Sequence, residues 1–413
     1  MPQVALPALA VSVRFVSGAD NTGFALGTAR LGTATLGDAD DDSVWESVES
    51  DTRSVWLSSG KSRDLDVYRS STASIVLDNR ARAYDPLNLA GPHVSGGVTQ
   101  IKPGRRIRIR ATDPTTSTVH DMYKGTIREW GLGYTTPSDA TATISASDQL
   151  TDLNNTDVTV LTTLALSGVV AVQVLDAAGI PADVQAGAST LQATQFTVEN
   201  ALTAMQGVVT AEQGALYATP DGVLQFDGRN ALLTETRSNT SQATFGSGNL
   251  TIDQIFVEYA SDLIKNAISV TRTGGTAQDA TDATSVNDYG KRSHTITGAM
   301  NSEDTETLNM ARHILASFKE PEVRVRSISI APQAHGDLMT QALTRQLRDR
   351  ITVYYVPPGG GTAISVDAFI AGINHQIIAG QMATMFTLES TTGRSSGWLL
   401  GTSDLGTGTI LTF

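Results

Sequence analysis

The chain has 413 residues, a formal net charge of −13, 40% hydrophobic and 17% charged residues, and no cysteine. It is longer than the roughly 250–300 residues at which one hydrophobic core stops growing, so two to four domains are expected. The composition is typical of a globular protein, excludes disulfides and thiolate metal sites, and argues against a general nucleic-acid binder. The sequence has no apolar run of the roughly 18 residues that a membrane helix needs, and its N-terminus lacks the basic start of a signal peptide, so we expect synthesis in the cytosol.

The first 60 residues are rich in Gly and Thr and carry an acidic run at 38–51. Four carboxylates have the spacing of ligands in a Ca²⁺-binding loop, namely Asp38, Asp40, Asp42 and Glu49. The sixth position of such a loop needs Gly for a sharp turn, and here it is Ser43. We therefore favour a solvated acidic loop over a calcium site, and we interpret 1–60 as an N-terminal arm that includes this loop.

Residues 61–164 have the pattern of a small antiparallel β-barrel. Short stretches rich in β-branched residues are separated by Pro, Asp and Gly turns. These stretches lie at 70–79, 105–112, 122–134 and 140–148.

Residues 165–235 change to helical spacing. Apolar residues at 167–181 and 196–217 favour two helices, and Thr197 together with Asn200 is expected to open the second one. A β-hairpin is predicted at 216–229, turning at a Pro-Asp-Gly triplet. This part is interpreted as a helical-plus-hairpin domain.

Residues 236–390 return to the strand pattern and are interpreted as a second barrel. The polar segment 272–300 is expected to form a long excursion from it. A helix is predicted over 302–320, with Ser302 as its cap and acidic residues in its first turn.

The second barrel repeats the order of elements in the first. Three pairs of segments correspond, namely 105–112 with 348–355, 123–130 with 369–376, and 141–148 with 383–390. With a shift of one residue within the first two pairs, Arg106 lies opposite Arg350 and Gly125 lies opposite Gly372. The expected fold is therefore mainly β, with two related small antiparallel β-barrels in tandem and the helical-plus-hairpin domain between them.

A basic strand in this acidic chain calls for an explanation. Side chains alternate between the two faces of a strand, so Arg106, Arg108 and Arg110 share one face while Ile107 and Ile109 share the other. The isoleucines belong in a core, whereas the arginines need carboxylate or solvent partners.

A second repeat involves the two ends of the chain. Segments 26–36 and 400–410 share the pattern Leu-Gly-Thr-x-x-Leu-Gly-Thr-x-Thr-apolar. Apolar residues five apart fit neither a helix nor a strand, so 391–413 is either an extended arm that inserts Leu400, Leu405 and Ile410 into pockets on another surface, or a Gly-rich hairpin.

Signatures of catalysis are missing from the sequence. The six histidines do not have the spacing of a His-Glu-x-x-His motif, and no Gly-x-Ser-x-Gly elbow occurs. We assign no catalytic, cofactor or metal residue, and we expect no enzyme and no cofactor.

The first barrel and the helical-plus-hairpin domain after it resemble the minor tail proteins of long-tailed phages that infect actinobacteria. The resemblance rests on a strand ending in Asn, an Asp-Pro-x-Asn turn, a Pro-Gly-Arg entry to a basic strand, and the subsequent helix and hairpin. Here these are Asn79, Asp85-Pro86-Leu87-Asn88, Pro103-Gly104-Arg105, and 199–229; the C-terminal Leu-Gly-Thr ending is also similar. The similarity covers about 60–390 at the level of pattern.

Membership in this family implies a baseplate hub at the tail tip of the virion. Three copies, each with two barrels, would form a ring of six near-equivalent surfaces around the DNA exit channel. Such a ring would join the six-fold tail tube or distal tail ring protein above it to fibre, spike or other minor tail proteins below, with the end of the tape-measure protein as a further possible neighbour. The DNA would pass without sequence-specific binding. Two alternatives stay open: a hexameric distal tail ring protein, and a tail-tip protein that binds or degrades the host cell wall.

This arrangement suggests a place for the arginines. We expect them to pair with carboxylates where neighbouring barrels meet in the ring. The candidates are Arg106, Arg108, Arg110, Arg324, Arg326 and Arg350. The alternative is a solvated face with weak ion pairs.

Overall fold

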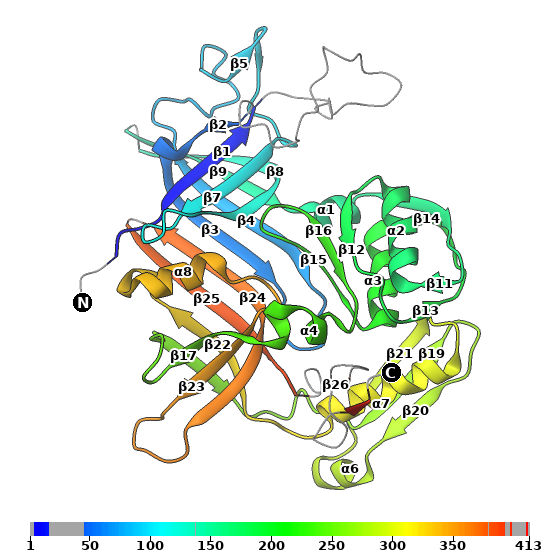
Figure 1. Ribbon diagram of the computed structural model, residues 1–413. Coiled ribbons are helices and arrows are strands. Elements are labelled where there is room, and N and C mark those ends of the chain that lie inside the picture. Colours follow the sequence, from blue (N-terminus) through cyan, green and yellow to red (C-terminus); the bar gives the residue numbers. More distant parts are fainter. Residues whose placement is uncertain are drawn as a thin grey trace.

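The computed structural model describes residues 4–15, 45–136, 138–378, 380–392, 397–398 and 410–411. Its largest feature is one 13-stranded sheet, flanked by two smaller units (Figure 1). The expected mainly-β fold is confirmed. The two expected β-barrels correspond to two groups of strands in this one sheet, which we call the first and second β-units, and a helical-plus-hairpin unit lies between them in the chain.

The first β-unit contains five strands that lie in the order β3-β4-β9-β8-β7. Their bounds are β3 Thr52–Gly60, β4 Arg69–Asp78, β7 Arg106–Thr112, β8 Val119–Thr136 and β9 Asp139–Ser147. Outside β7 come β1 (Ala8–Arg14) and β2 (Glu46–Ser47). The first unit therefore begins before residue 61: the alternating apolar residues of β1 and β3 place them in the sheet, although 1–60 was expected to be an arm.

The second β-unit has the same order of strands, β18-β22-β25-β24-β23. Their bounds are β18 Gln254–Glu258, β22 Arg324–Ile330, β23 Arg350–Tyr355, β24 Ile364–Ile378 and β25 Gln381–Ser390. β17 (Ser241–Gly246) lies outside β23. In both units the five strands also follow one another in the same chain order, which supports the internal repeat.

The strand registers correct one detail of the predicted alignment. Ile107 lies opposite Gly125, and Ile351 lies opposite Ala368. Arg106 and Arg350 are therefore equivalent, as expected, whereas Gly125 is equivalent to Ala368 and not to Gly372. Low sequence identity between the units allowed a shift of four residues along this strand.

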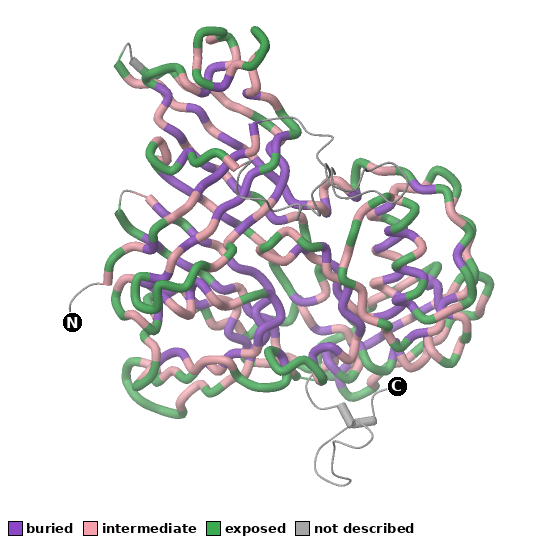
Figure 2. The backbone as a smooth tube through the Cα atoms, turned by 45° about the horizontal axis from the view of Figure 1, so that its top comes forward, coloured by how far each residue is buried: buried purple, intermediate pink, exposed green. Residues whose placement is uncertain are grey.

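The two units meet where β3 pairs with the second half of β24. Gly372 to Ile378 lie antiparallel to Gly60 to Ser54. One hydrophobic core extends through both units, and Figure 2 shows its buried residues running along the sheet. Within the described residues, the two units are thus joined by backbone pairing into a continuous sheet.

The helical-plus-hairpin unit has a core of its own. Its helices are α1 Gln149–Asn154, α2 Ser167–Ala178 and α3 Ala201–Glu212. Its strands are β10 Asp157–Leu161, β11 Ala165–Leu166, β12 Ala182–Val184, β13 Thr190–Leu191, β14 Gln195–Asn200, β15 Ala215–Ala218 and β16 Leu224–Asp227. Its core begins at Leu150, ahead of the expected boundary at 165.

Helix α3 is fixed at both ends. The side chain of Asn200 caps its start by accepting a hydrogen bond from Thr203 N, whereas Thr197, which was expected to act with it, lies in β14. At its end, the fully buried carboxylate of Glu212 accepts bonds from Ser167 Oγ at 2.7 Å and from the backbone N–H of Ser189 at 2.7 Å and Arg229 at 3.0 Å. Glu212 therefore ties α3 to α2 and to the two loops beside it.

The segment 272–300 lies outside the large sheet, as expected of an excursion, and it is ordered. Its strands form a small sheet that packs on the following helix. The elements are β19 Ala267–Arg272, β20 Gln278–Thr281, α6 Ala283–Tyr289, β21 Ser293–Ala299 and α7 Asp304–Phe318. Ser302 does not cap α7, whose N-cap is Glu303 without a side-chain bond; Asp304 bonds Arg272 and Thr276 instead.

The remaining elements are short. The helices are η2 Glu49–Asp51, α4 Ala231–Thr234, α5 Thr236–Asn239, η3 Pro332–Ala334 and α8 Gly336–Thr344. The strands are β5 Val94–Ser95, β6 Val98–Thr99, β26 Gly397–Trp398 and β27 Ile410–Leu411.

Candidate functional site

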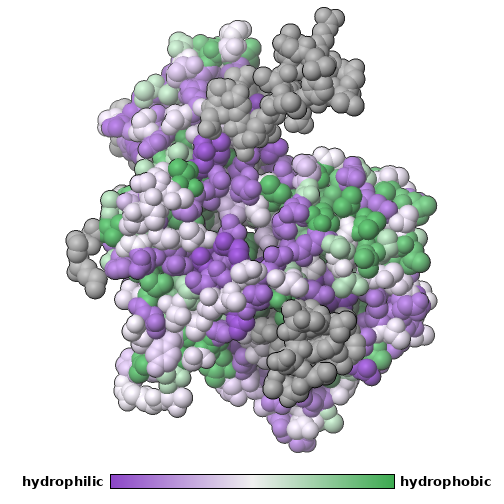
Figure 3. Space-filling view, viewed as in Figure 1, coloured by the Kyte–Doolittle hydropathy of each residue, from purple (hydrophilic) through white to green (hydrophobic). Residues whose placement is uncertain are grey.

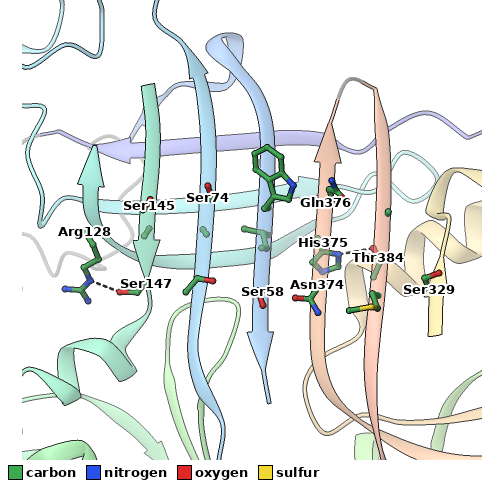
Figure 4. A pocket seen from close by; sticks show the side chains of 17 residues that line it. Ser58, Ser74, Arg128, Ser145, Ser147, Ser329, Asn374, His375, Gln376 and Thr384 are labelled. Carbon is green, nitrogen blue, oxygen red and sulfur yellow. Dashed lines mark hydrogen bonds between the residues drawn. The ribbon is translucent and has the colours of Figure 1, made fainter. Parts of the chain in front are cut away.

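A hollow of about 670 Å³ crosses the junction of the two β-units. It lies over six neighbouring strands, β9, β4, β3, β24, β25 and β22 (Figure 4). Many of its outward-facing side chains are small and polar, among them Ser58, Thr72, Ser74, Ser145, Asn374, Gln376 and Ser329, and the larger Trp56 and Met385 also line it. We call this surface the polar face.

Two arginines on and beside the polar face are paired with carboxylates of the chain. Arg128 donates to Ser147 Oγ and Asp152 Oδ1, both at 2.6 Å. Arg53 bonds Asp139 at 2.8 Å, and the pKa of that carboxyl is lowered by this hydrogen bond. The face therefore offers hydroxyls and amides, and both arginines are compensated by carboxylates.

His375 is buried at the junction. Its Nδ1 lies 2.9 Å from Thr384 Oγ1, and burial lowers the pKa of its imidazole to about 4. The ring is therefore neutral near pH 7. The described residues contain no group of three His, Cys, Asp or Glu side chains that could hold a metal ion.

Buried ion pairs hold the units against each other. Lys61 Nζ, just after β3, lies 2.6 Å from Glu389 Oε2 of β25, and both side chains are at most 8% exposed. Arg348, just before β23, contacts Asp227 of the hairpin at 3.0 Å, and Asp227 also accepts a bond from Tyr217. Because removing one partner of a buried pair is strongly destabilising, these contacts favour a fixed arrangement of the units.

The arginines of the first β-unit alternate as predicted, with Ile107 and Ile109 fully buried on the opposite face. Arg108 is only 5% exposed, and its guanidinium lies 4.7 Å from the ring centre of Trp45. β7 pairs with β1 on one side and β8 on the other, so it is not an edge strand. Arg106 and Arg110 could therefore contact another copy only through their side chains on the face of β7, and not through pairing of its edge. This role stays a prediction.

The arginines of the second β-unit have carboxylate partners in the chain. Arg324 is buried against Asp64, Arg326 lies 3.8 Å from Glu258, and Arg350 bonds Asp367. Their strands, β22 and β23, are also interior to the sheet. Their role at an interface between copies stays a prediction.

Several sequence-based candidates lie outside the described residues. These are the calcium-like carboxylates Asp38, Asp40 and Asp42 and the arm residues Leu400 and Leu405. Ile410 is described only as part of the backbone of β27, opposite Gly397.

The helical-plus-hairpin unit carries an apolar surface that sequence reasoning missed. Figure 3 shows hydrophobic side chains gathered over this unit. The exposed residues are Leu161, Leu164, Leu166, Val169, Val172 and Val198, with exposed fractions from 41% to 69%. An exposed cluster of this kind marks a contact site on many proteins. The helical periodicity showed two apolar helices but could not show which apolar residues the short strands leave uncovered.

No helix among the described residues combines the length and apolar character required to cross a bilayer.

Comparison with known proteins identifies the fold. No protein-family profile and no curated protein sequence matches the chain. The tail protein from Neisseria meningitidis MC58 is similar in structure, with a TM-score of 0.59 and 13% identity over 94% of this chain and 98% of that one. The 43 kDa tail protein of prophage MuSo2 from Shewanella oneidensis has a TM-score of 0.54 and 14% identity over 85% of this chain and 96% of that one. The chain therefore has the fold of these two tail proteins.

Proposed function

We propose that this protein is a structural component of a phage tail tip, a hub in which three copies form a ring. The observation that carries the proposal is the internal repeat: two β-units with one strand order occur in a chain whose fold matches tail proteins along nearly its whole length. Its origin in a long-tailed phage of actinobacteria rests on the sequence resemblance alone.

The repeat favours three copies over six. A tail tube is six-fold, and a tapering tip is three-fold. Three chains with two near-equivalent units each present six similar surfaces upward and three-fold symmetry downward. A hexameric distal tail ring protein would need only one such unit per chain, so the second unit argues against that alternative.

The polar face suits the wall of a DNA channel. Hydroxyl and amide side chains, together with paired charges, give DNA phosphates no row of free cations to bind. In the proposed ring this face lines the channel, and DNA slides past it without sequence-specific contacts. A wall of unpaired arginines would instead retard the DNA.

The proposed partners are other tail proteins. The ring would contact the tail tube or distal tail ring protein above, and fibre, spike or other minor tail proteins below, with the end of the tape-measure protein nearby. The apolar surface on the helical-plus-hairpin unit is a candidate for one of these contacts. A cell-wall binding or degrading protein is the alternative, and cell-wall binding or peptidoglycan cleavage by the purified chain would favour it.

The test is a cryo-EM reconstruction of the tail tip without imposed symmetry. Three copies with six β-units around a channel are expected, with the polar face toward the channel. Six copies would favour the distal tail ring protein, and absence of the chain from the particle would refute a tail role.

A further inference from the structure

β3 of the first unit pairs with β24 of the second unit, and we call this pairing the internal joint. By strand order, β18 of the second unit is equivalent to β3, and β8 of the first unit is equivalent to β24. β18 and β8 do not pair with each other within the chain. β7 covers one edge of β8 only as far as Thr126, and within the described residues no strand pairs with that edge over 128–136. Likewise, β18 pairs with β22 on one side, and no described strand lies on its other side.

Aligned residues across each sheet set the equivalence at single-residue precision. A β-bulge follows Ile127 in β8 and Ile370 in β24, and it marks the same point in both units. In each unit, the first residue paired after the bulge begins a row of directly opposed residues that crosses four strands. These rows are Glu129–Ser145–Ser74–Trp56 in the first unit and Gly372–Thr387–Ser327–Phe256 in the second. Residues at the same place in the two rows are equivalent.

The internal joint then predicts a second one. In the internal joint Trp56 lies opposite Gln376. The residue equivalent to Trp56 is Phe256. Gln376 lies four residues after Gly372, and the residue four after the equivalent Glu129 is Gly133, so Gly133 is equivalent to Gln376. One chain cannot make both joints with itself because its two units already meet through β3 and β24.

We propose that the open edge of β18 pairs antiparallel with the open edge of β8 in another copy of this chain, with Phe256 opposite Gly133. The inference rests on the proposed ring and assigns the surface that closes it. Each copy offers the edge of β18 to one neighbour and the edge of β8 to the other. The contact is therefore head-to-tail and repeats from copy to copy until the ring closes.

Exposure of the side chains agrees with a missing neighbour. At the internal joint Ile377 is 8% exposed and Trp56 is half-buried. The residue equivalent to Ile377 is Tyr134, which is 59% exposed, and the residue equivalent to Trp56 is Phe256, which is 53% exposed. Aromatic side chains are thus held at both open edges, where a paired strand would cover them.

Glycine opposite an aromatic residue is a stable pair across strands. Gly133 has no side chain on the face that it would share with Phe256, so the ring of Phe256 can lie over its backbone. Arg326 already lies 5.8 Å from that ring, on the side of the second unit, and helps to hold it in position.

The absence of cysteine from the chain permits a direct test. In the purified full chain, Gly133→Cys with Phe256→Cys should form disulfides between copies, giving linked species up to a closed trimer on a non-reducing gel. Leu132→Cys with Phe256→Cys is the control, because a shift of one residue puts the two thiols on opposite faces. Trp56→Cys with Gln376→Cys should link within one chain, which verifies that the sheet folds when cysteines are introduced.

A second measurement does not depend on cysteine pairs. Phe256→Lys should weaken self-association of the chain by about tenfold or more in sedimentation, because the charge replaces an apolar contact at the edge. Val323→Lys, at another half-exposed apolar site, should leave self-association unchanged.

The outcomes separate this inference from the proposed function. Links between copies at 133 and 256, absent from the shifted control, support the edge pairing. A trimer or tail-tip ring without these links overturns the pairing and leaves the tail role standing. A chain that stays monomeric at every soluble concentration also overturns it, and the presence of that chain in tail particles would still support the tail role.

Discussion

Glu212 offers a sharp test of how the helical-plus-hairpin unit is held together. Its buried carboxylate accepts hydrogen bonds from Ser167 Oγ and from the backbone N–H of Ala188, Ser189 and Arg229, at 2.7 to 3.0 Å. Glu212→Gln keeps the volume but replaces one acceptor oxygen with an N–H donor, which then faces a backbone donor. Loss of one bond to a charged group and one unsatisfied buried N–H together destabilise the unit by about 3 kcal/mol.

The pH dependence follows from the same contacts. Burial alone would raise the pKa of Glu212, but the bonds from Arg229 N, Ser189 N and Ser167 outweigh it and lower the pKa below its ordinary value. A carboxyl with a lowered folded pKa stabilises the fold above its unfolded pKa, and this stabilisation is lost as pH falls through the folded value. The difference between wild type and Glu212→Gln should therefore be full at neutral pH and shrink in acid.

Hydrogen exchange is the suitable assay because a chain of several units need not unfold in one step. Amides of α3 and of Ser189 should exchange faster by roughly a hundredfold in Glu212→Gln, as about 3 kcal/mol implies. The partly exposed Glu199 in the same unit provides the control, and Glu199→Gln should leave these rates unchanged. A change of less than tenfold in Glu212→Gln, or an effect that grows in acid, would refute the reasoning.

Three further outcomes are expected. The imidazole of His375 should titrate near pH 4 by NMR. In the unfolded chain it takes up its proton near pH 6.5, so the free energy of unfolding should fall as the pH drops from about 6.5 toward 4. His375→Gln should remove this part of the pH dependence. Gly60→Ala should lower the melting temperature more than Gly104→Ala: both positions have positive φ, but a Cβ at Gly60 would lie 2.2 Å from a backbone oxygen of β24, while Gly104 has open space. Arg348→Met should destabilise the chain by about 3 kcal/mol in urea unfolding and expose the hairpin to protease, because it leaves Asp227 buried without its cation; an unchanged midpoint would contradict this.

The sequence predicted those strands that carry a strong local signal. Alternating Arg and Ile identified β7, and the Pro-Asp-Gly turn identified the hairpin of β15 and β16. The repeat was found from strand order, which the sheet topology bears out. Local signals also marked 272–300 correctly as lying outside the barrel pattern, but its polar, short strands did not reveal that α7 covers them.

Long-range pairing limited the prediction of the site. β3 carries Ser and Gly among its apolar residues, so its sequence did not distinguish a strand from the Gly-rich arm before it. Its place was decided by β4 and β24, the latter more than 300 residues away. The polar face exists only because these strands lie together, and no spacing within one segment could predict it.

The two joints of the proposed ring face different physical demands. The joint within the chain forms as the chain folds, so it can consist of a long strand whose Val55 and Leu57 are at most 5% exposed. The edges between copies must remain soluble until copies meet, and a long apolar edge would aggregate. β18 accordingly spans five residues where β3 spans nine, and its partner edge carries glycines in place of side chains. Phe256 and Tyr134 are then buried only when copies meet in the ring. The shorter β18–β8 pairing between copies is therefore suited to assembly, whereas the longer β3–β24 pairing forms within the chain.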